Sequence, residues 1–223
     1  MRRPTLLCAT SLLVMLATAS AQAGLRQPQV PVSGTALATF FASQGQSINV
    51  NTDQVDVQQM SYTSTTGFEV RTFATASGIS FGLHNAAPQS PKLYMVRPAS
   101  SAAGWYEKCA FQSAPARLVV NTFDPNDAAQ GSVTYNGADR SAFSLYVTAA
   151  AGTFYLQDAR NAGTAKILAF SGTGARAGWT WFAAETSAGP GGDFSDFVAL
   201  VNLSSVTTPT QRTAWGRLKQ LYH

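Results

Sequence analysis

Short apolar runs, each closed by turn residues, are the feature that most constrains this fold. The stretch FEVRTFATA (Phe68–Ala76) alternates Phe68 and Val70 with Glu69 and Arg71. A period of two is typical of a strand with one buried face. Similar runs follow: SFGLHN, KLYMV, RLVVNTF, SVTYN, AFSLYVT, TFYLQD, KILAFSG, WTWFAAE and DFVALVNL. Because Gly, Pro, Asn, Asp or Ser bounds each run, the sequence predicts an all-β protein, an antiparallel β-sandwich of jelly-roll type.

Two segments show a helical pattern instead. Residues 34–45 (GTALATFFASQG) carry apolar side chains three and four positions apart and end at Gly45, a common stop for a helix. Residues 213–223 (TAWGRLKQLYH) place Trp215 and Tyr222 on one face. The sequence therefore predicts a short N-terminal helix and a short C-terminal helix beside the sandwich.

The first 23 residues have the order of a secretory signal peptide. Two arginines come first, an apolar run from Leu6 to Leu16 follows, and Ala21-Gln22-Ala23 precedes Gly24. The apolar run is shorter than the roughly 20 residues that a membrane-spanning helix needs. We therefore expect cleavage after Ala23 and a protein that is secreted, periplasmic or held at the cell surface.

The remaining chain is organised as one domain with a tail. Residues 24–203 have the size of a single β-sandwich domain, and no part of them approaches the length of a membrane span. Residues 204–223 are expected to form a linker and an amphipathic tail. The net charge of +4 falls by two once Arg2 and Arg3 are removed. The other basic residues are scattered rather than clustered, which argues against nucleic acid as a partner.

Cysteine usage is sparse. Cys8 leaves with the signal peptide, so Cys109 is alone and no intramolecular disulfide can form. A single free cysteine most often occupies a buried apolar position, and we expect Cys109 to do so. The alternative is an exposed thiol that joins two chains.

An acidic turn opens the last apolar run, GGDFSDFVALVNL (residues 191–203). Asp193 and Asp196, with Glu185 from the preceding run, supply carboxylate oxygens of the kind that Ca²⁺ prefers. The alternative is that the two aspartates accept hydrogen bonds from turn amides. Apolar residues occupy both parities after Asp196, which predicts a strand that is buried on both faces.

The order of elements in the C-terminal half carries a family resemblance. The segments FSLYVTAAAGTFYLQDARNAGTAKILAF, WTWFAAE and GDFSDFVALV follow one another over about residues 143–203. This arrangement resembles the DUF4114 family of secreted bacterial proteins, which are often PEP-CTERM-type or adhesin-like. The resemblance implies an extracellular setting. The chain does not end in the sorting signal of PEP-CTERM proteins, so the resemblance does not imply anchoring.

The resemblance also bears on the acidic turn. Glu185 matches the family's glutamate, and Asp193 and Asp196 match its closing acidic motif, for which a calcium role has been inferred. Thr186 and Ser195 stand where the family has acidic or amide residues, and Gly191 likewise replaces an aspartate. These departures remove oxygen ligands, so the expectation is no obligatory cofactor, with calcium at Glu185, Asp193 and Asp196 as the one metal hypothesis.

Catalysis has little support in the sequence. No HExxH or CxxC motif occurs, and His84 and His223 are the only histidines. Aromatic side chains that could stack on a sugar are Trp105, Tyr106, Trp179 and Trp181, and of these the sequence favours Trp105 and Tyr106 as ligand-binding residues. We therefore expect a non-catalytic extracellular binding or structural module whose partner is an extracellular protein or a glycan. A carbohydrate-binding domain is the alternative, and a hydrolase is the third hypothesis.

Overall fold

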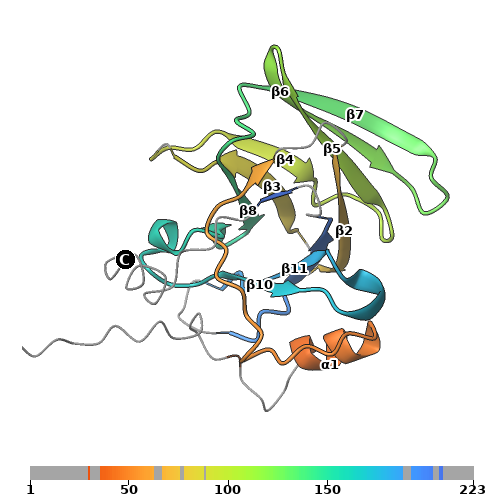
Figure 1. Ribbon diagram of the computed structural model, residues 1–223, viewed down its shortest axis with the longest axis vertical. Coiled ribbons are helices and arrows are strands. Elements are labelled where there is room, and N and C mark those ends of the chain that lie inside the picture. Colours follow the sequence, from red (N-terminus) through yellow and green to blue (C-terminus); the bar gives the residue numbers. More distant parts are fainter. Residues whose placement is uncertain are drawn as a thin grey trace, which may run out of the picture.

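The chain folds into two antiparallel β-sheets packed face to face (Figure 1). The computed structural model describes residues 30, 36–62, 67–75, 78–87, 89–187, 192–202 and 206–207. Within these residues there are thirteen strands and one α-helix, α1 (Ala36–Ser43). The predicted all-β antiparallel sandwich is therefore confirmed. The predicted signal peptide and C-terminal helix lie outside the described residues.

The larger sheet has seven strands in the order β10-β11-β12-β2-β5-β6-β7. In that order the strands span Ile167–Ser171, Thr180–Ala184, Phe197–Val201, Phe68–Thr75, Tyr106–Ser113, Ala116–Phe123 and Ala129–Asn136. Every neighbouring pair is antiparallel. Two hairpin series, β5-β6-β7 and β10-β11-β12, therefore form the two ends of the sheet, and β2 joins them.

The smaller sheet has four strands in the order β4-β3-β8-β9. These strands span Leu93–Arg97, Ser80–Asn85, Phe143–Ala149 and Gly152–Tyr155. A two-stranded ribbon pairs β1 (Ser61–Tyr62) with β13 (Val206–Thr207), and two short 3-10 helices, η1 (Asp158–Asn161) and η2 (Gly174–Arg176), lie in the connections. The consecutive strands β2 and β3 lie in different sheets, and each pairs with a strand of the C-terminal half, β12 and β8. This wrapping is jelly-roll-like.

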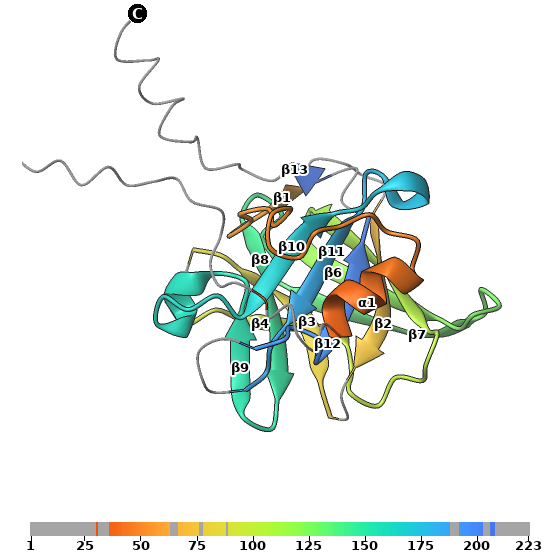
Figure 2. The same ribbon diagram turned by 90° about the horizontal axis from the view of Figure 1, so that it is seen from below.

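Two hydrophobic cores hold the layers together. The main core lies between the sheets and includes Phe81, Phe143 and Cys109, which is 1% exposed. The buried position expected for Cys109 is thus confirmed. A second core lies on the outer face of the larger sheet, where residues of α1 pack on β10, β11 and β12 (Figure 2).

Strand β12 belongs to both cores. Phe197, Ala199 and Val201 face the core between the sheets, while Val198 and Leu200 face the second core. All five residues of this strand are buried. The prediction of a strand buried on both faces is confirmed, and the reason is that α1 supplies a third layer at this end of the sheet.

Helix α1 forms where the sequence predicts the N-terminal helix. Leu37 and Phe41, one turn apart, are both fully buried. At the C-terminal end the Gln46 amide donates to the Phe41 carbonyl, and the Gly45 amide donates to the Ala42 carbonyl, with Gly45 at φ +68°. This is a Schellman cap. No helix among the described residues combines the length and apolar character that a membrane crossing requires.

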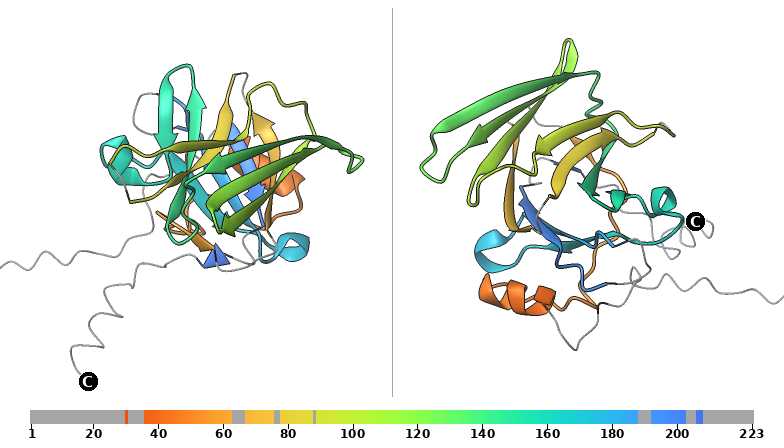
Figure 3. Two further views of the ribbon diagram at one scale, coloured as in Figure 1. Left: turned by 90° about the horizontal axis from the view of Figure 1, so that it is seen from above. Right: turned by 180° about the vertical axis from the view of Figure 1, so that it is seen from behind.

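At the opposite end of the larger sheet, the β6–β7 hairpin extends beyond the rest of the sandwich (Figure 3). Strand β7 is exposed at every position except Tyr135, which is partly buried against the main core. No described segment forms a layer comparable to α1 on the outer face at this end. The larger sheet is thus covered on both faces at the β12 end and on one face at the β5–β6 end.

Candidate functional site

The uncovered outer face of the larger sheet presents two cross-strand rows of side chains. Alternation along each strand sends Phe68, Val70 and Cys109 inward, so the residues between them face outward. Strand register then aligns Arg71, Tyr106 and Phe123 in one row and Glu69, Lys108 and Asn121 in the other. We call these six residues the open face.

Tyr106 is the centre of the open face. Its ring stacks on Phe123 with the centroids 5.4 Å apart and the planes at 19°. The Arg71 guanidinium lies 4.7 Å from the ring centroid, and the Lys108 ammonium lies 5.3 Å from it. These neighbours leave Tyr106 only 3% exposed. The Tyr106 ring therefore contacts two cations, and cation–π attraction stabilises this arrangement.

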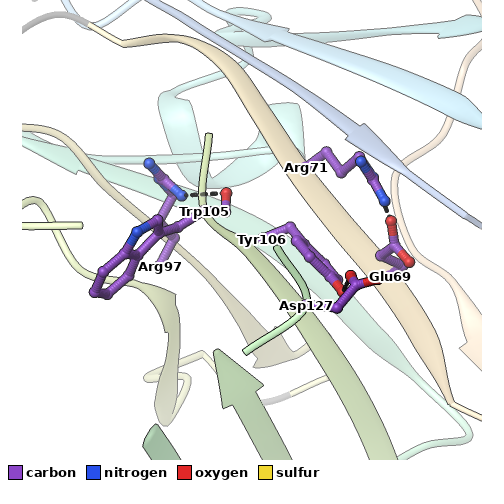
Figure 4. A network of polar contacts seen from close by, with 6 residues as sticks. All are labelled: Glu69, Arg71, Arg97, Trp105, Tyr106 and Asp127. Atoms are coloured by element: carbon purple, nitrogen blue, oxygen red, sulfur yellow. Dashed lines mark hydrogen bonds and ion pairs between the residues drawn. The ribbon is translucent and has the colours of Figure 1, made fainter. Parts of the chain in front are cut away.

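Polar contacts fix the edges of this cluster (Figure 4). The Tyr106 hydroxyl donates a short hydrogen bond to Asp127, which lies in the turn between β6 and β7. That hydrogen bond raises the pKa of Tyr106 above its ordinary value. Arg71 forms an ion pair with Glu69 on its own strand. Lys108 is exposed and also lies 4.6 Å from the centroid of Phe123.

A shallow hollow of about 340 Å³ adjoins the second row of the open face. Glu69, Lys108 and Asn121 line it from the sheet, and Asn202 closes it beside β12. Gly67 forms part of its floor, and a Cβ there would come within 2.7 Å of the Cys109 carbonyl oxygen. The hollow thus combines a cation, a carboxylate and two amide side chains, groups that hydrogen-bond to polar ligands.

The structure does not bring the predicted pair Trp105 and Tyr106 together on one face. Trp105 precedes β5, and its indole points away from the Tyr106 ring (Figure 4). Trp105 is partly buried, and its carbonyl oxygen accepts a hydrogen bond of 3.0 Å from Nη1 of Arg97. The other two tryptophans are held by the fold, since Trp181 is fully buried under α1 and Trp179 packs against the second core.

A buried ion pair lies behind the open face, inside the sandwich. Glu107 on β5 is fully buried, and its Oε1 lies 3.5 Å from Nη1 of Arg97 on β4. Nη2 of Arg97 donates to the Ala102 carbonyl at 3.0 Å. The second carboxyl oxygen of Glu107 has no hydrogen-bond partner within the described part of the chain. Burial raises the pKa of Glu107 to about 7, and the nearby Arg97 opposes that rise.

This ion pair was not among the features predicted from the sequence. A signal was present, because Glu107 has the same strand parity as Cys109 and Phe111, which both face the core. A charged residue at a core-facing position requires a partner of opposite charge. The sequence could not identify Arg97 as that partner, since the contact crosses from one sheet to the other.

The acidic turn is a network of capping hydrogen bonds. Oδ1 of Asp193 accepts hydrogen bonds from the amide and hydroxyl of Ser195, at 3.0 and 2.8 Å. Oδ2 of Asp196 accepts from the amide and hydroxyl of Thr186, both at 2.8 Å. Oε1 of Glu185 accepts from the Ser187 amide at 3.0 Å. The carboxylates thus tie the start of β12 to the end of β11.

These contacts occupy carboxylate oxygens that the calcium hypothesis assigns to the ion. Burial acts to raise the pKa of Asp196, but the hydrogen bonds from Thr186 outweigh it and hold that pKa below its ordinary value. Glu185 packs so closely on Gly192 that a Cβ at Gly192 would overlap the carboxylate. Among the described residues there is no cluster of three or more His, Cys, Asp or Glu side chains arranged to hold a metal ion. Calcium at Glu185, Asp193 and Asp196 stays a prediction.

His84, the one histidine in the described part of the chain, is fully buried on β3. It lies on the opposite face of its sheet from the core that contains Cys109. Nδ1 lies 2.9 Å from the Asn85 carbonyl oxygen, and the ring packs edge-on against Tyr155. Burial lowers the pKa of His84 to about 4. The imidazole is therefore neutral at physiological pH and closed to a substrate.

Comparison with known proteins adds no family assignment. No protein-family model matches the chain, and no curated protein is significantly similar to it in sequence. The resemblance of residues 143–203 to the DUF4114 family stays a prediction.

Proposed function

We propose that this protein is a secreted, non-catalytic extracellular binding module and that the open face is its ligand surface. One observation carries the proposal: α1 packs on the outer face of the larger sheet at β10, β11 and β12 and reaches Phe73 of β2, whereas the open face presents charged, amide and aromatic side chains beside a hollow. A sheet face left uncovered and furnished with such groups is suited to surface recognition.

The positions of the nucleophile and base candidates support a non-catalytic role. His84 and Cys109 are both buried, and they lie on different sheets. Glu107 is fully buried beside Arg97. A general base must reach a substrate proton within hydrogen-bonding distance. None of these three groups is placed to do so.

A glycan is the ligand class that the open face favours within this proposal. Amide and charged side chains match sugar hydroxyls, and aromatic rings match the apolar faces of sugars. Glu69 is paired with Arg71, so the exposed Lys108 is the cation that the open face offers to a ligand. An exposed cation favours an acidic polysaccharide over a neutral one. The ring of Tyr106 is covered, so its role is to hold the cations rather than to stack on the sugar.

Binding to an acidic polysaccharide such as alginate, with neutral dextran as comparison, tests this proposal. We expect Lys108→Glu to weaken alginate binding by at least about tenfold. The substitution replaces the exposed cation by a carboxylate, which repels the negatively charged polysaccharide. Arg140→Glu is the matched control, since it makes the same charge change in the β7–β8 connection. Equal binding by both variants would place the ligand surface elsewhere. Absence of binding to either polymer would remove the glycan from the proposal.

A further inference from the structure

Strand β7 is a free edge of the larger sheet. Among the described strands it pairs only with β6, and it stands at the end of the strand order. It is eight residues long, and seven of them are exposed to solvent. Long exposed edges are templates for pairing with another strand, and most proteins protect them with charges, proline or a covering segment.

The strand itself lacks the first two of these protections. The sequence AQGSVTYN contains no charged residue and no proline. Val133, at its centre, is 51% exposed, the highest value among the exposed large hydrophobic residues of the described chain. Both properties favour pairing, because neither charge nor proline has to be accommodated and an exposed apolar side chain becomes covered.

The backbone geometry shows which groups are available at the edge. The Gly137 amide donates to the Ala116 carbonyl and so points toward β6, while the Gly137 carbonyl accepts from the side chains of Asn85 and Tyr94. Alternation along an antiparallel ladder then turns Asn136, Thr134 and Ser132 outward. The Asn136 carbonyl agrees with this, since it accepts a hydrogen bond of 2.8 Å from Nζ of Lys92 on the outer side. Ser132 and Thr134 therefore present their amides and carbonyls to solvent.

We propose that two copies of this chain associate by antiparallel pairing of their β7 strands. In this arrangement Ser132 of one copy exchanges backbone hydrogen bonds with Thr134 of the other. Val133 then lies opposite Val133 of the second copy on the twofold axis, as a non-hydrogen-bonded pair. The two larger sheets become one continuous sheet. The inference goes beyond the proposed ligand surface, because it concerns a different part of the molecule.

The charges at the two ends of β7 support a second copy as the occupant. Asp124 and Asp127 lie in the turn that leads into β7. Arg117 is in register with Asn136 at the other end, and Lys92 bonds there. Antiparallel pairing places the acidic end of each copy beside the basic end of the other. Asp139 also lies beyond Asn136, so the complementarity rests on Asp124 and Asp127 against Lys92 and Arg117, and such opposite charges favour antiparallel pairing.

Oligomeric state is the first test, measured by sedimentation velocity on the mature protein over a range of concentrations. We expect the apparent mass to rise about twofold with concentration. Val133→Lys should keep the monomeric mass at every concentration. Leu93→Lys is the matched control, because it replaces an exposed hydrophobic residue on another edge strand, β4, and it should still dimerise. A wild-type protein that stays monomeric throughout would overturn the proposal.

Cysteine cross-linking tests the register. On the twofold axis two Val133→Cys side chains lie within disulfide distance, whereas two Thr134→Cys side chains are offset along the strands. Cys109 is buried and serves as the internal control. We expect rapid oxidation of Val133→Cys to a covalent dimer and slow oxidation of Thr134→Cys. Equal rates for the two variants would contradict this pairing, even if the protein dimerises by another surface.

Discussion

Strands β12 and β7 belong to the same sheet, yet one is completely buried and the other is almost completely exposed. β12 reads FVALV, with apolar residues at both parities, and both of its faces are covered. β7 reads AQGSVTYN, with polar or small residues at most positions, and it has one neighbour and little cover. The composition of a strand thus reports how many of its faces are covered. The covered half contributes the second core, and the open half carries the surfaces for which binding is proposed.

The largest expected effect comes from removing a side chain of the covered half. Trp181 is fully buried and packs against Phe41 and Phe73. Trp181→Ala should lower the free energy of unfolding by about 3–5 kcal/mol, because it leaves a cavity beneath α1. Val133→Ala on β7 should change it by less than about 0.5 kcal/mol. Urea unfolding of dilute protein measures both changes. Similar losses of unfolding free energy in the two variants would contradict the difference between the halves.

The titration of Glu107 tests whether water is excluded from the inner face of the open half as fully as from the covered half. Its pKa is about 7 in the folded chain and its ordinary value is 4.5, so the folded state binds the extra proton between these values. Stability from this group is therefore complete at low pH and is lost as the pH rises through this window, by about 3 kcal/mol. The free energy of unfolding of Glu107→Gln, relative to that of the wild type, should therefore rise by that amount between acid and neutral pH.

Chemical unfolding at a series of pH values measures this difference. His84 acts in the opposite direction, because its pKa of about 4 makes the folded state lose stability as the pH falls from 6.5. Its contribution cancels when the Glu107→Gln variant is compared with wild type at each pH. A difference that does not vary with pH would mean that water reaches Glu107.

The acidic turn should have a smaller effect on stability. Asp196→Ala removes both hydrogen bonds from Thr186, and we expect a loss of about 1–2 kcal/mol. Thermal melts with calcium and with a chelator belong to the same experiment. Capping alone predicts little change with calcium. A melting temperature that rises by several degrees in calcium, and no longer does so in Asp193→Ala, would instead establish a cation site.

The fold was more accessible from the sequence than the open face. Apolar residues at both parities after Asp196 were enough to predict a doubly buried strand, and Gly45 marked the end of α1. The open face depends on which strands become neighbours, and the pairing of β2 with β5 and β12 joins distant segments. Local sequence patterns do not indicate which distant strands pair. They could not show that Arg71 and Lys108 would flank Tyr106, or that Asp196 would cap Thr186.

The smallest effect is expected for labelling of the Cys109 thiol in the native protein. Burial raises the pKa of Cys109 well above its ordinary value, so the thiol is both inaccessible and protonated. A thiol reagent should label the native protein slowly and the unfolded protein fully. Rapid labelling of the native protein, followed by mass spectrometry, would show that β5 opens readily and that the open half is not a stable layer.

Hydrogen–deuterium exchange of the dilute protein tests the contrast between the two halves most directly. Amides of β11 and β12 should exchange at rates close to those set by global unfolding, since both of their faces are covered. The outward amides of Ser132 and Thr134 should exchange fastest within the larger sheet. Equal protection along β7 and β12 at low concentration would contradict the division of this sheet into a covered half and an open half.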